Sequence, residues 1–139
     1  METNVIIKYS LYEECRKEAE RHKWIMSEQA GRDLGEPALF HWVKDHWNGY
    51  LRARWLEHLE GKKFWLELDR GDFGLFQRHD TMQDKAALLE CILDRLKAGQ
   101  ENLNIINWAL DWNLNLADVR EILEILDINS RRVAHRFDS

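Results

Sequence analysis

The chain has 139 residues, the length of one ordinary domain, and a chain this long can bury a core without a disulfide or a metal. Hydrophobic residues make up 45% and charged residues 32%, which excludes a disordered class, and no apolar run approaches the roughly 18 residues of a membrane span. The net charge is -5, and the acidic excess lies after residue 63. Nonspecific binding to phosphate backbones depends on Lys and Arg, so this balance argues against it.

The two cysteines, Cys15 and Cys91, lie far apart and form no CxxC motif. This spacing gives no zinc or redox motif and is typical of free thiols in a reducing compartment. The N-terminus shows no basic stretch followed by an apolar segment and a cleavage site. We therefore expect no signal peptide and a cytoplasmic protein.

A first long helix is predicted from the capping-box pattern that begins at Ser10, with Glu13 three residues later. The helix should run to about Ala30, because Gly31 can take the left-handed conformation that ends a helix.

A second long helix is predicted to begin near Gly35, with Pro37 in its first turn, and to stop at Gly61. Two helices of this length joined by about five residues predict an antiparallel hairpin over residues 10–61.

The rest of the chain is expected to cover this hairpin. Residues 62–80 contain Gly71 and Gly74 among several aromatic residues, which predicts an irregular, packed connection with a short extended piece near 64–68. A third helix should begin at Asp80 or Thr81 and end near Lys97, and three short helices are expected near 101–112, 116–126 and 130–137. The prediction is one all-α domain over residues 1–139, with its helical C-terminal part at 81–139.

Ionisable side chains lie on the faces of the two long helices that should be buried. If the turn centres on residues 33–34, facing residues have numbers that sum to about 68. His22 then faces His46, Glu18 faces Tyr50, and Glu14 faces Arg54. The predicted buried polar cluster consists of Glu14, Glu18, His22, His46, Tyr50, Arg54 and Glu57.

Three interpretations of this cluster stay open. In the first interpretation, the cluster is a structural network in which a Glu14–Arg54 ion pair fixes the helix register. Alternatively, Glu18, His22 and His46 hold a transition metal, although the Glu-x-x-His spacing of helix-bundle metal sites is absent. A third interpretation is a small-ligand pocket or an acid–base pair.

Seven tryptophans are many for this length, and three of them lie off the main apolar faces of the long helices. Exposed tryptophan beside arginine is typical of a protein interface, so we predict an interface formed by Trp24, Trp42, Trp55 and Arg52. The alternative is that residues 64–139 bury these rings.

Residues 105–122 read IINWALDWNLNLADVREI, with Ala109 where two helices cross closely and Asn113 in the turn. This segment resembles the helix-turn-helix of many DNA-binding regulators. Its second helix presents mostly acidic residues, which argues against a DNA contact. A basic end at Arg131, Arg132 and Arg136 is the one candidate nucleic-acid contact.

The sequence shows no nucleophile elbow, phosphate-binding glycine loop or dinucleotide motif, so we predict no catalytic residues and lean away from an enzyme. The leading hypothesis is a non-catalytic helical interaction or adaptor protein that self-associates as a homodimer. One alternative is a helix-bundle protein that binds a metal or cofactor, and a second is a helix-turn-helix DNA-binding regulator. No cofactor is predicted beyond a transition metal at the histidine pair, and no membrane or nucleic-acid partner is expected.

Overall fold

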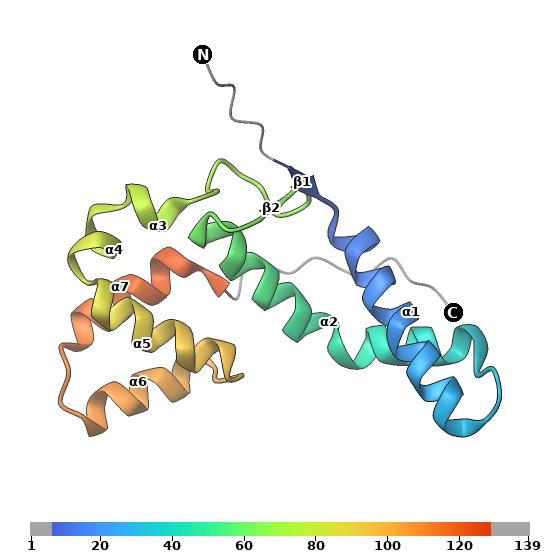
Figure 1. The fold of residues 1–139 in the computed structure, drawn as a ribbon. Coiled ribbons are helices and arrows are strands. Elements are labelled where there is room, and N and C mark those ends of the chain that lie inside the picture. Colours follow the sequence, from blue (N-terminus) through green and yellow to red (C-terminus); the bar gives the residue numbers. More distant parts are fainter. Residues whose placement is uncertain (1–6, 129–139) are drawn as a thin grey trace, which may run out of the picture.

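The computed structural model describes residues 7–128 and is all-α, as predicted (Figure 1). The elements in chain order are β1 (Lys8–Tyr9), α1 (Leu11–Ala30), α2 (Gly35–Glu60), β2 (Phe64–Trp65), α3 (Leu75–Arg78), α4 (Asp80–Asp84), α5 (Ala86–Lys97), α6 (Asn102–Asp111) and α7 (Leu116–Leu126).

Helices α1 and α2 form the predicted antiparallel hairpin. The Ser10 hydroxyl caps α1 by accepting the Glu13 N–H at 3.5 Å, and Gly31 ends the helix at a φ of 70°. Gly61 ends α2 in the same conformation, at a φ of 77°. Both helices therefore begin and end where the sequence predicts.

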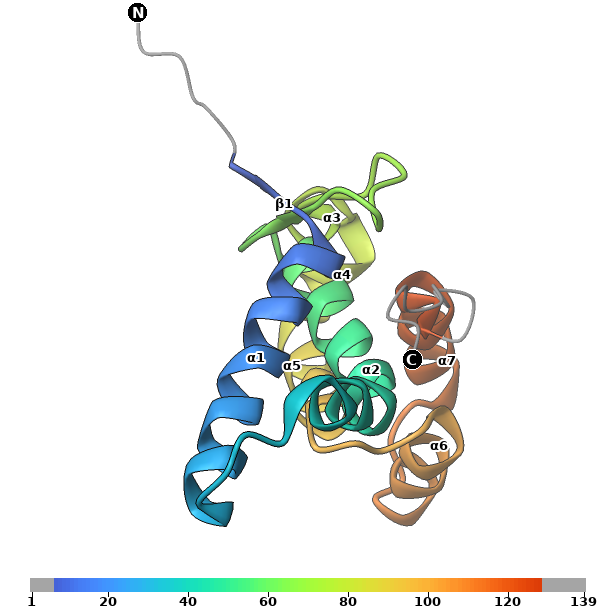
Figure 2. The ribbon, with the colours of Figure 1, turned by 90° about the vertical axis from the view of Figure 1, so that its right-hand side faces the viewer.

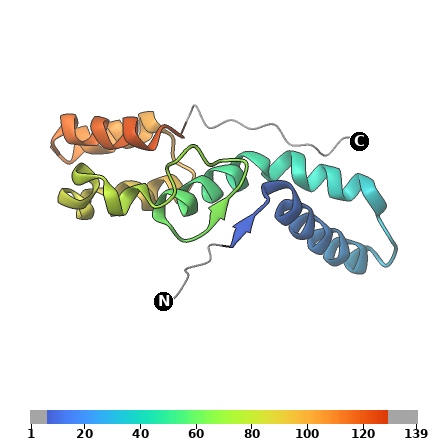
Figure 3. The same ribbon diagram turned by 90° about the horizontal axis from the view of Figure 1, so that it is seen from above.

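Helix α2 is the spine of the molecule. Its N-terminal half packs against α1, and its C-terminal half packs against the later helices (Figure 3). The pair formed by α6 and α7 lies on the opposite side of α2 from α1 (Figure 2). The core therefore follows α2 along its length, and its largest fully buried side chains include Leu11, Leu39, Trp55, Leu59, Ile92, Ile105 and Ile122.

The connection after α2 is more ordered than expected. Strand β2 pairs in parallel with β1, with Lys8 opposite Phe64 and Tyr9 opposite Trp65. Glu67, which follows this strand, accepts hydrogen bonds from the Ser10 hydroxyl and the Leu11 N–H at the start of α1. A carboxylate is favourable at a helix N-terminus, so this contact ties the connection to α1.

The predicted third helix is divided into α4 and α5 at Lys85, whose backbone leaves the helical conformation (φ -115°, ψ 36°). The Lys85 ammonium lies 2.6 Å from the Asp118 carboxylate of α7. The prediction of one continuous helix was wrong here, because helical periodicity alone does not reveal a break made at a residue of ordinary helix propensity.

Helices α6 and α7 match two of the three predicted tail helices. Asn113 in their turn has a φ of 54°, and Ala109 is fully buried where the helices cross. The third predicted tail helix lies outside the described residues. None of the helices within residues 7–128 is long and apolar enough to cross a membrane.

Candidate functional site

The hairpin brings much of the predicted polar cluster to one hollow. An open surface groove of about 410 Å³ lies along α2 beside Glu18 of α1. Four members of the cluster line it together with three further residues of α2. The lining residues are Glu18, Trp42, Asp45, His46, Gly49, Tyr50 and Arg54.

The prediction that this cluster is buried was wrong. His46 is exposed, and the other six members, Glu14, Glu18, His22, Tyr50, Arg54 and Glu57, are half-buried. Among the described residues, α6 and α7 lie on the side of α2 away from α1, so they do not cover this cluster (Figure 2).

The predicted ion pair between Glu14 and Arg54 is replaced by pairs within each helix. Glu14 pairs with Lys17 at 3.3 Å, and Arg54 pairs with Glu57 at 2.5 Å. Residues three apart on one helix are neighbours on its surface, and these partners are closer than any across the seam. The cluster consequently contributes less to helix register than the structural interpretation required.

The two predicted histidines do face each other, but they form no metal site with Glu18. The His22 and His46 ring centroids are 6.3 Å apart, and each ring lies within 5 Å of the Trp42 ring. The Glu18 carboxylate pairs with Arg21 at 3.0 Å. Within residues 7–128, ligand atoms within 4.8 Å of one another occur in one set of three, which is His58, Asp69 and Asp72.

Most residues of the predicted interface are buried or hydrogen-bonded within the molecule. Trp42 and Trp55 belong to the core, and the Trp55 indole donates to the Leu126 carbonyl at 2.8 Å. Arg52 bonds the Gln100 carbonyl at 3.1 Å and the Glu101 carboxylate at 2.9 Å. Of the four predicted residues, Trp24 alone is exposed, at 73%. Residues after 64 contact Trp55 and Arg52, in line with the alternative that the sequence left open, whereas Trp42 stacks on His22 of α1.

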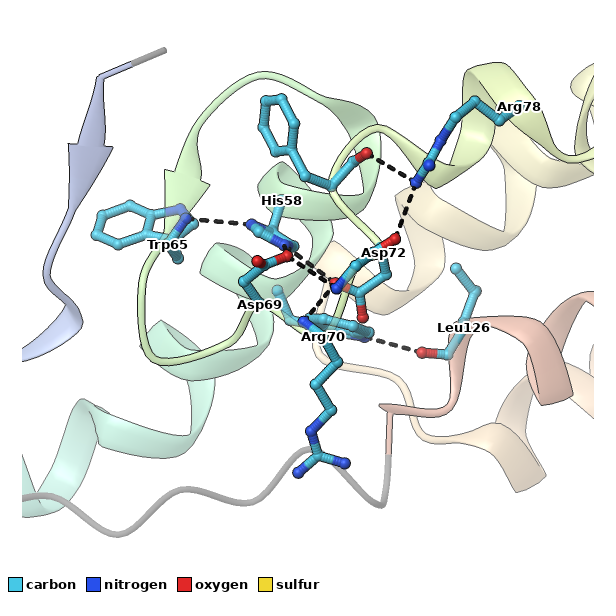
Figure 4. A network of polar contacts seen from close by, with 10 residues as sticks. His58, Trp65, Asp69, Arg70, Asp72, Arg78 and Leu126 are labelled. Carbon is cyan, nitrogen blue, oxygen red and sulfur yellow. Dashed lines mark hydrogen bonds and ion pairs between the residues drawn. The ribbon is translucent and has the colours of Figure 1, made fainter.

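His58, near the C-terminal end of α2, was missed by the sequence analysis. Its side chain is fully buried, and its Nε2 lies 3.2 Å from Asp69 Oδ1 and 3.1 Å from Asp72 Oδ1 (Figure 4). The ring packs edge-on against Phe64 and Phe73, with centroids 5.0 and 5.3 Å away. A histidine among the apolar residues at the end of a helix, followed by an Asp-x-x-Asp loop, is the sequence signal for this centre.

One hydrogen bond fixes the protonation of His58. The Trp65 backbone N–H donates to Nδ1 at 3.1 Å, so Nδ1 carries no proton and the neutral ring keeps its proton on Nε2. That proton is shared by the two aspartates. A metal on Nε2 would require an imidazole with no proton on either nitrogen for as long as the Trp65 bond is kept. The geometry therefore favours a structural hydrogen-bond network around His58 over a metal centre.

The aspartates also shape their own loop. Asp69 Oδ1 accepts the Gly71 N–H at 3.1 Å, and Asp72 Oδ1 accepts the Arg70 N–H at 3.2 Å. Residues 70–72 spell Arg-Gly-Asp, a tripeptide known from integrin ligands, which we attribute to chance in this chain. The Asp72 side chain is only 13% exposed and is turned toward His58, so it is not presented to a receptor.

An exposed apolar surface lies on the tail. Leu103 and Leu110 of α6 are 68% and 59% exposed, and Trp112 at the end of this helix is 72% exposed. Trp24, Ile25 and Met26 are exposed at the other end of the molecule, near the hairpin turn (Figure 1). Of these residues only Trp24 was predicted to be exposed. The surface on α6 was not predicted, because exposure on a short helix depends on which of its faces the neighbouring helices cover.

Helices α6 and α7 are joined by a short turn and pack on each other, but the side chains of α7 that a DNA contact would use are mostly acidic and contact other helices. Its Asp118 pairs with Lys85 at 2.6 Å, and its Glu121 accepts the Thr81 hydroxyl at 3.0 Å. An acidic recognition helix repels phosphate. The predicted nucleic-acid contact at Arg131, Arg132 and Arg136 lies outside the described residues, so that hypothesis stays a prediction.

Two acidic groups beside the seam have raised pKa values. Burial raises the pKa of the Cys15 thiol from 9.0 to about 11, and Glu18 adds to the rise while Arg54 opposes it. Burial likewise raises the pKa of the Tyr50 hydroxyl from 10.0 to about 12, against the opposing effect of Arg54. Both groups are therefore neutral at physiological pH, and Cys15 is not an activated thiol.

We expect the free energy of unfolding to fall as pH rises through about 9 to 12. An acidic group whose pKa is raised on folding stabilises the fold below its unfolded pKa, and that contribution is lost as pH rises through the folded value. Urea unfolding at about pH 8 and about pH 11 measures the loss. Between these two pH values, the free energy of unfolding should fall less in a Cys15→Ala, Tyr50→Phe double variant than in a Cys91→Ala control. Equal losses in the two proteins would contradict this prediction.

No family model matches the chain, and no curated protein or solved structure is significantly similar to it.

Proposed function

We propose that the protein is a non-catalytic interaction protein that self-associates through α6. The observation that carries this proposal is the exposure of Leu103 and Leu110, which are seven residues apart and share one face of the helix. Ile106 lies between them and is half-buried. An apolar stripe of this kind on a surface helix is typical of an interface.

The charge of α6 supports the same proposal. Asp111 is the one charged residue among its ten, and the remaining polar residues are asparagines. Charged residues are depleted at the centres of interfaces, whereas a helix that faces only water usually carries several of them.

The stripe is self-complementary under a two-fold axis. If two copies of α6 pack antiparallel about the middle of the helix, Leu103 of one copy faces Leu110 of the other. Asp111 then faces Asn102, so no like charges meet. Such a contact is isologous, which is the usual form of a dimer interface. A ten-residue helix buries less than the roughly 800 Å² per partner of a standard interface, so the association should be weak and concentration-dependent.

We expect Leu110→Glu to abolish the association. Light scattering or sedimentation over a range of concentrations measures the fraction of dimer, and a buried carboxylate opposite an apolar side chain should shift it to monomer. Leu66→Glu is the matched control, because Leu66 is 50% exposed and lies outside α6. This control should associate as the wild type does.

A double variant tests the register. In the antiparallel pair, Leu103→Lys combined with Leu110→Glu places opposite charges face to face at both contacts. We expect this double variant to recover association that each single variant loses. A strictly monomeric wild type would overturn the proposal. A dimer that survives Leu110→Glu but is lost with Trp24→Glu would place the interface at the hairpin turn instead.

A further inference from the structure

The outer face of α1 is open beyond its first turn. The buried residues of this helix are Leu11, Cys15 and Ala19, which lie on the side that packs against α2. Figures 2 and 3 show α1 at the edge of the molecule, with α2 on one side and no other described element on the opposite side. Helix α1 has 20 residues and α6 has 10, so this open face is long enough to bind a partner helix.

Four exposed residues form a stripe on this face, which we call the α1 stripe. They are Lys17, Arg21, Trp24 and Glu28, and steps of four, three and four residues place them one above another along the helix. The α1 stripe is basic toward the N-terminus of α1 and acidic at its C-terminal end, with an indole ring between. Two such stripes placed antiparallel therefore present opposite charges to each other.

The charged groups of the α1 stripe are held only weakly within the molecule. Lys17 pairs with Glu14 at 3.3 Å, and the Lys17 side chain is 61% exposed. Arg21 pairs with Glu18 at 3.0 Å, and the Arg21 side chain is 66% exposed. Glu28 has no ion-pair partner within residues 7–128. Ion pairs this exposed contribute little to stability, so both cations can turn to another carboxylate at small cost.

A hollow beside Trp24 adds a shape to this pattern of charge. It has a volume of about 320 Å³ and lies where the end of α1 meets the turn to α2. Its lining consists of Lys23, Trp24, Ser27, Glu28, Arg32 and Asp33. A side chain that approaches the α1 stripe from outside therefore meets a recess and the carboxylate of Glu28 together.

We infer that the outer face of α1 binds the same face of a second copy of this chain, with the two helices antiparallel. If the numbers of facing residues sum to about 45, Lys17 faces Glu28 of the other copy. Arg21 then lies over the Trp24 ring, and a guanidinium over an indole face is favourable. Each contact forms twice, because the two copies are related by a two-fold axis.

Charge selects this register over its neighbour. If the facing numbers sum to about 49, Arg21 faces Glu28, but Lys17 then faces Arg32. Like charges that meet across an interface are costly. In the register that sums to about 45, Arg32 instead faces Glu13, and both residues are exposed. The charges of α1 are therefore self-complementary in that register.

This contact goes beyond the proposed function, because it lies at the opposite end of the molecule from α6 (Figure 1). A copy that uses both surfaces binds two neighbours, so species larger than a dimer form. The two contacts also differ in their response to salt. Salt screens exposed charges, which weakens the α1 contact and leaves the apolar contact of α6.

The test isolates the α1 contact in Leu110→Glu, which lacks the contact of α6. Sedimentation velocity at millimolar protein measures the species present. We expect Leu110→Glu to be dimeric at about 0.02 M salt and monomeric at about 0.5 M salt, because salt screens the charge pairs. The wild type should form species larger than a dimer at the lower salt and dimers at the higher. If only the α6 contact is wrong, the wild type is monomeric at the higher salt and dimeric at the lower, so the two failures are distinguishable.

Reversal of one charge, and then of both, tests the register in the same Leu110→Glu background. Lys17→Glu and Glu28→Lys should each weaken the low-salt dimer at least about tenfold, because each places like charges opposite each other twice. The two changes together exchange the charges and should restore the dimer. Arg16→Glu is the matched control, since Arg16 is also an exposed, ion-paired cation of α1 but lies outside the α1 stripe. It should leave the dimer unchanged.

Far-ultraviolet circular dichroism of each variant shows whether α1 is still folded. A Leu110→Glu protein that stays monomeric at the lower salt would overturn the inference. Failure of the exchanged pair to restore the dimer, or equal weakening by Arg16→Glu and Lys17→Glu, would overturn it as well.

Discussion

Replacement of His58 with alanine should destabilise the protein by about 3 kcal/mol or more, because several buried groups lose their partner at once. The Trp65 N–H loses its acceptor, and Asp69 and Asp72 lose the proton that they share. Urea unfolding measures the change. His41→Ala is the matched control, since its side chain is 73% exposed on the same helix, and it should change stability by less than about 0.5 kcal/mol.

A double-mutant cycle tests whether the shared proton is the cause. In the wild type, Asp72→Asn should be destabilising, because it removes a charged acceptor from the His58 N–H. In the His58→Ala background the same change should be neutral or stabilising, because it relieves the repulsion between two carboxylates that no longer have a common donor. An equal change in the free energy of unfolding in both backgrounds would show that Asp72 does not share the His58 proton.

Helix boundaries were predictable from sequence wherever a local signal encodes them. Ser10, Gly31 and Gly61 act through their own backbone or side chain, so they cap their helices whatever packs around them. Asn113 in the α6–α7 turn is a signal of the same kind. The break at Lys85 has no such local signal, because it accompanies a contact with a residue 33 positions away.

The candidate sites were predicted less well, because burial is decided by elements far apart in the sequence. Facing positions on α1 and α2 follow from hairpin geometry, and this is why His22 and His46 do lie opposite each other. Whether the seam is covered depends on where α6 and α7 dock, and they dock across α2. His58 was overlooked because its partners come from a loop, and no helical periodicity marks a loop residue that turns inward.

Trp55 connects α2 to the end of α7. Trp55→Ala should lower the free energy of unfolding by about 3–5 kcal/mol. Its ring is 2% exposed and stacks on His58 with centroids 6.0 Å apart, and its indole N–H holds the Leu126 carbonyl at the end of α7. The large cavity and the unpaired carbonyl both contribute to the loss. Trp24→Ala is the control, because that ring is 73% exposed and should cost less than about 0.5 kcal/mol.

The position of Trp55 also predicts which helix should open more readily when its indole N–H is removed. The Leu126 carbonyl binds the Trp55 indole and so connects α7 to α2. The contacts between α1 and α2 do not involve this carbonyl. Trp55→Phe keeps an aromatic ring, although a smaller one, and removes the indole N–H. Amide hydrogen exchange in this variant should therefore rise in α7 and stay near wild type in α1. Uniform acceleration across both helices would show instead that the chain unfolds as one unit and that this hydrogen bond has no local role.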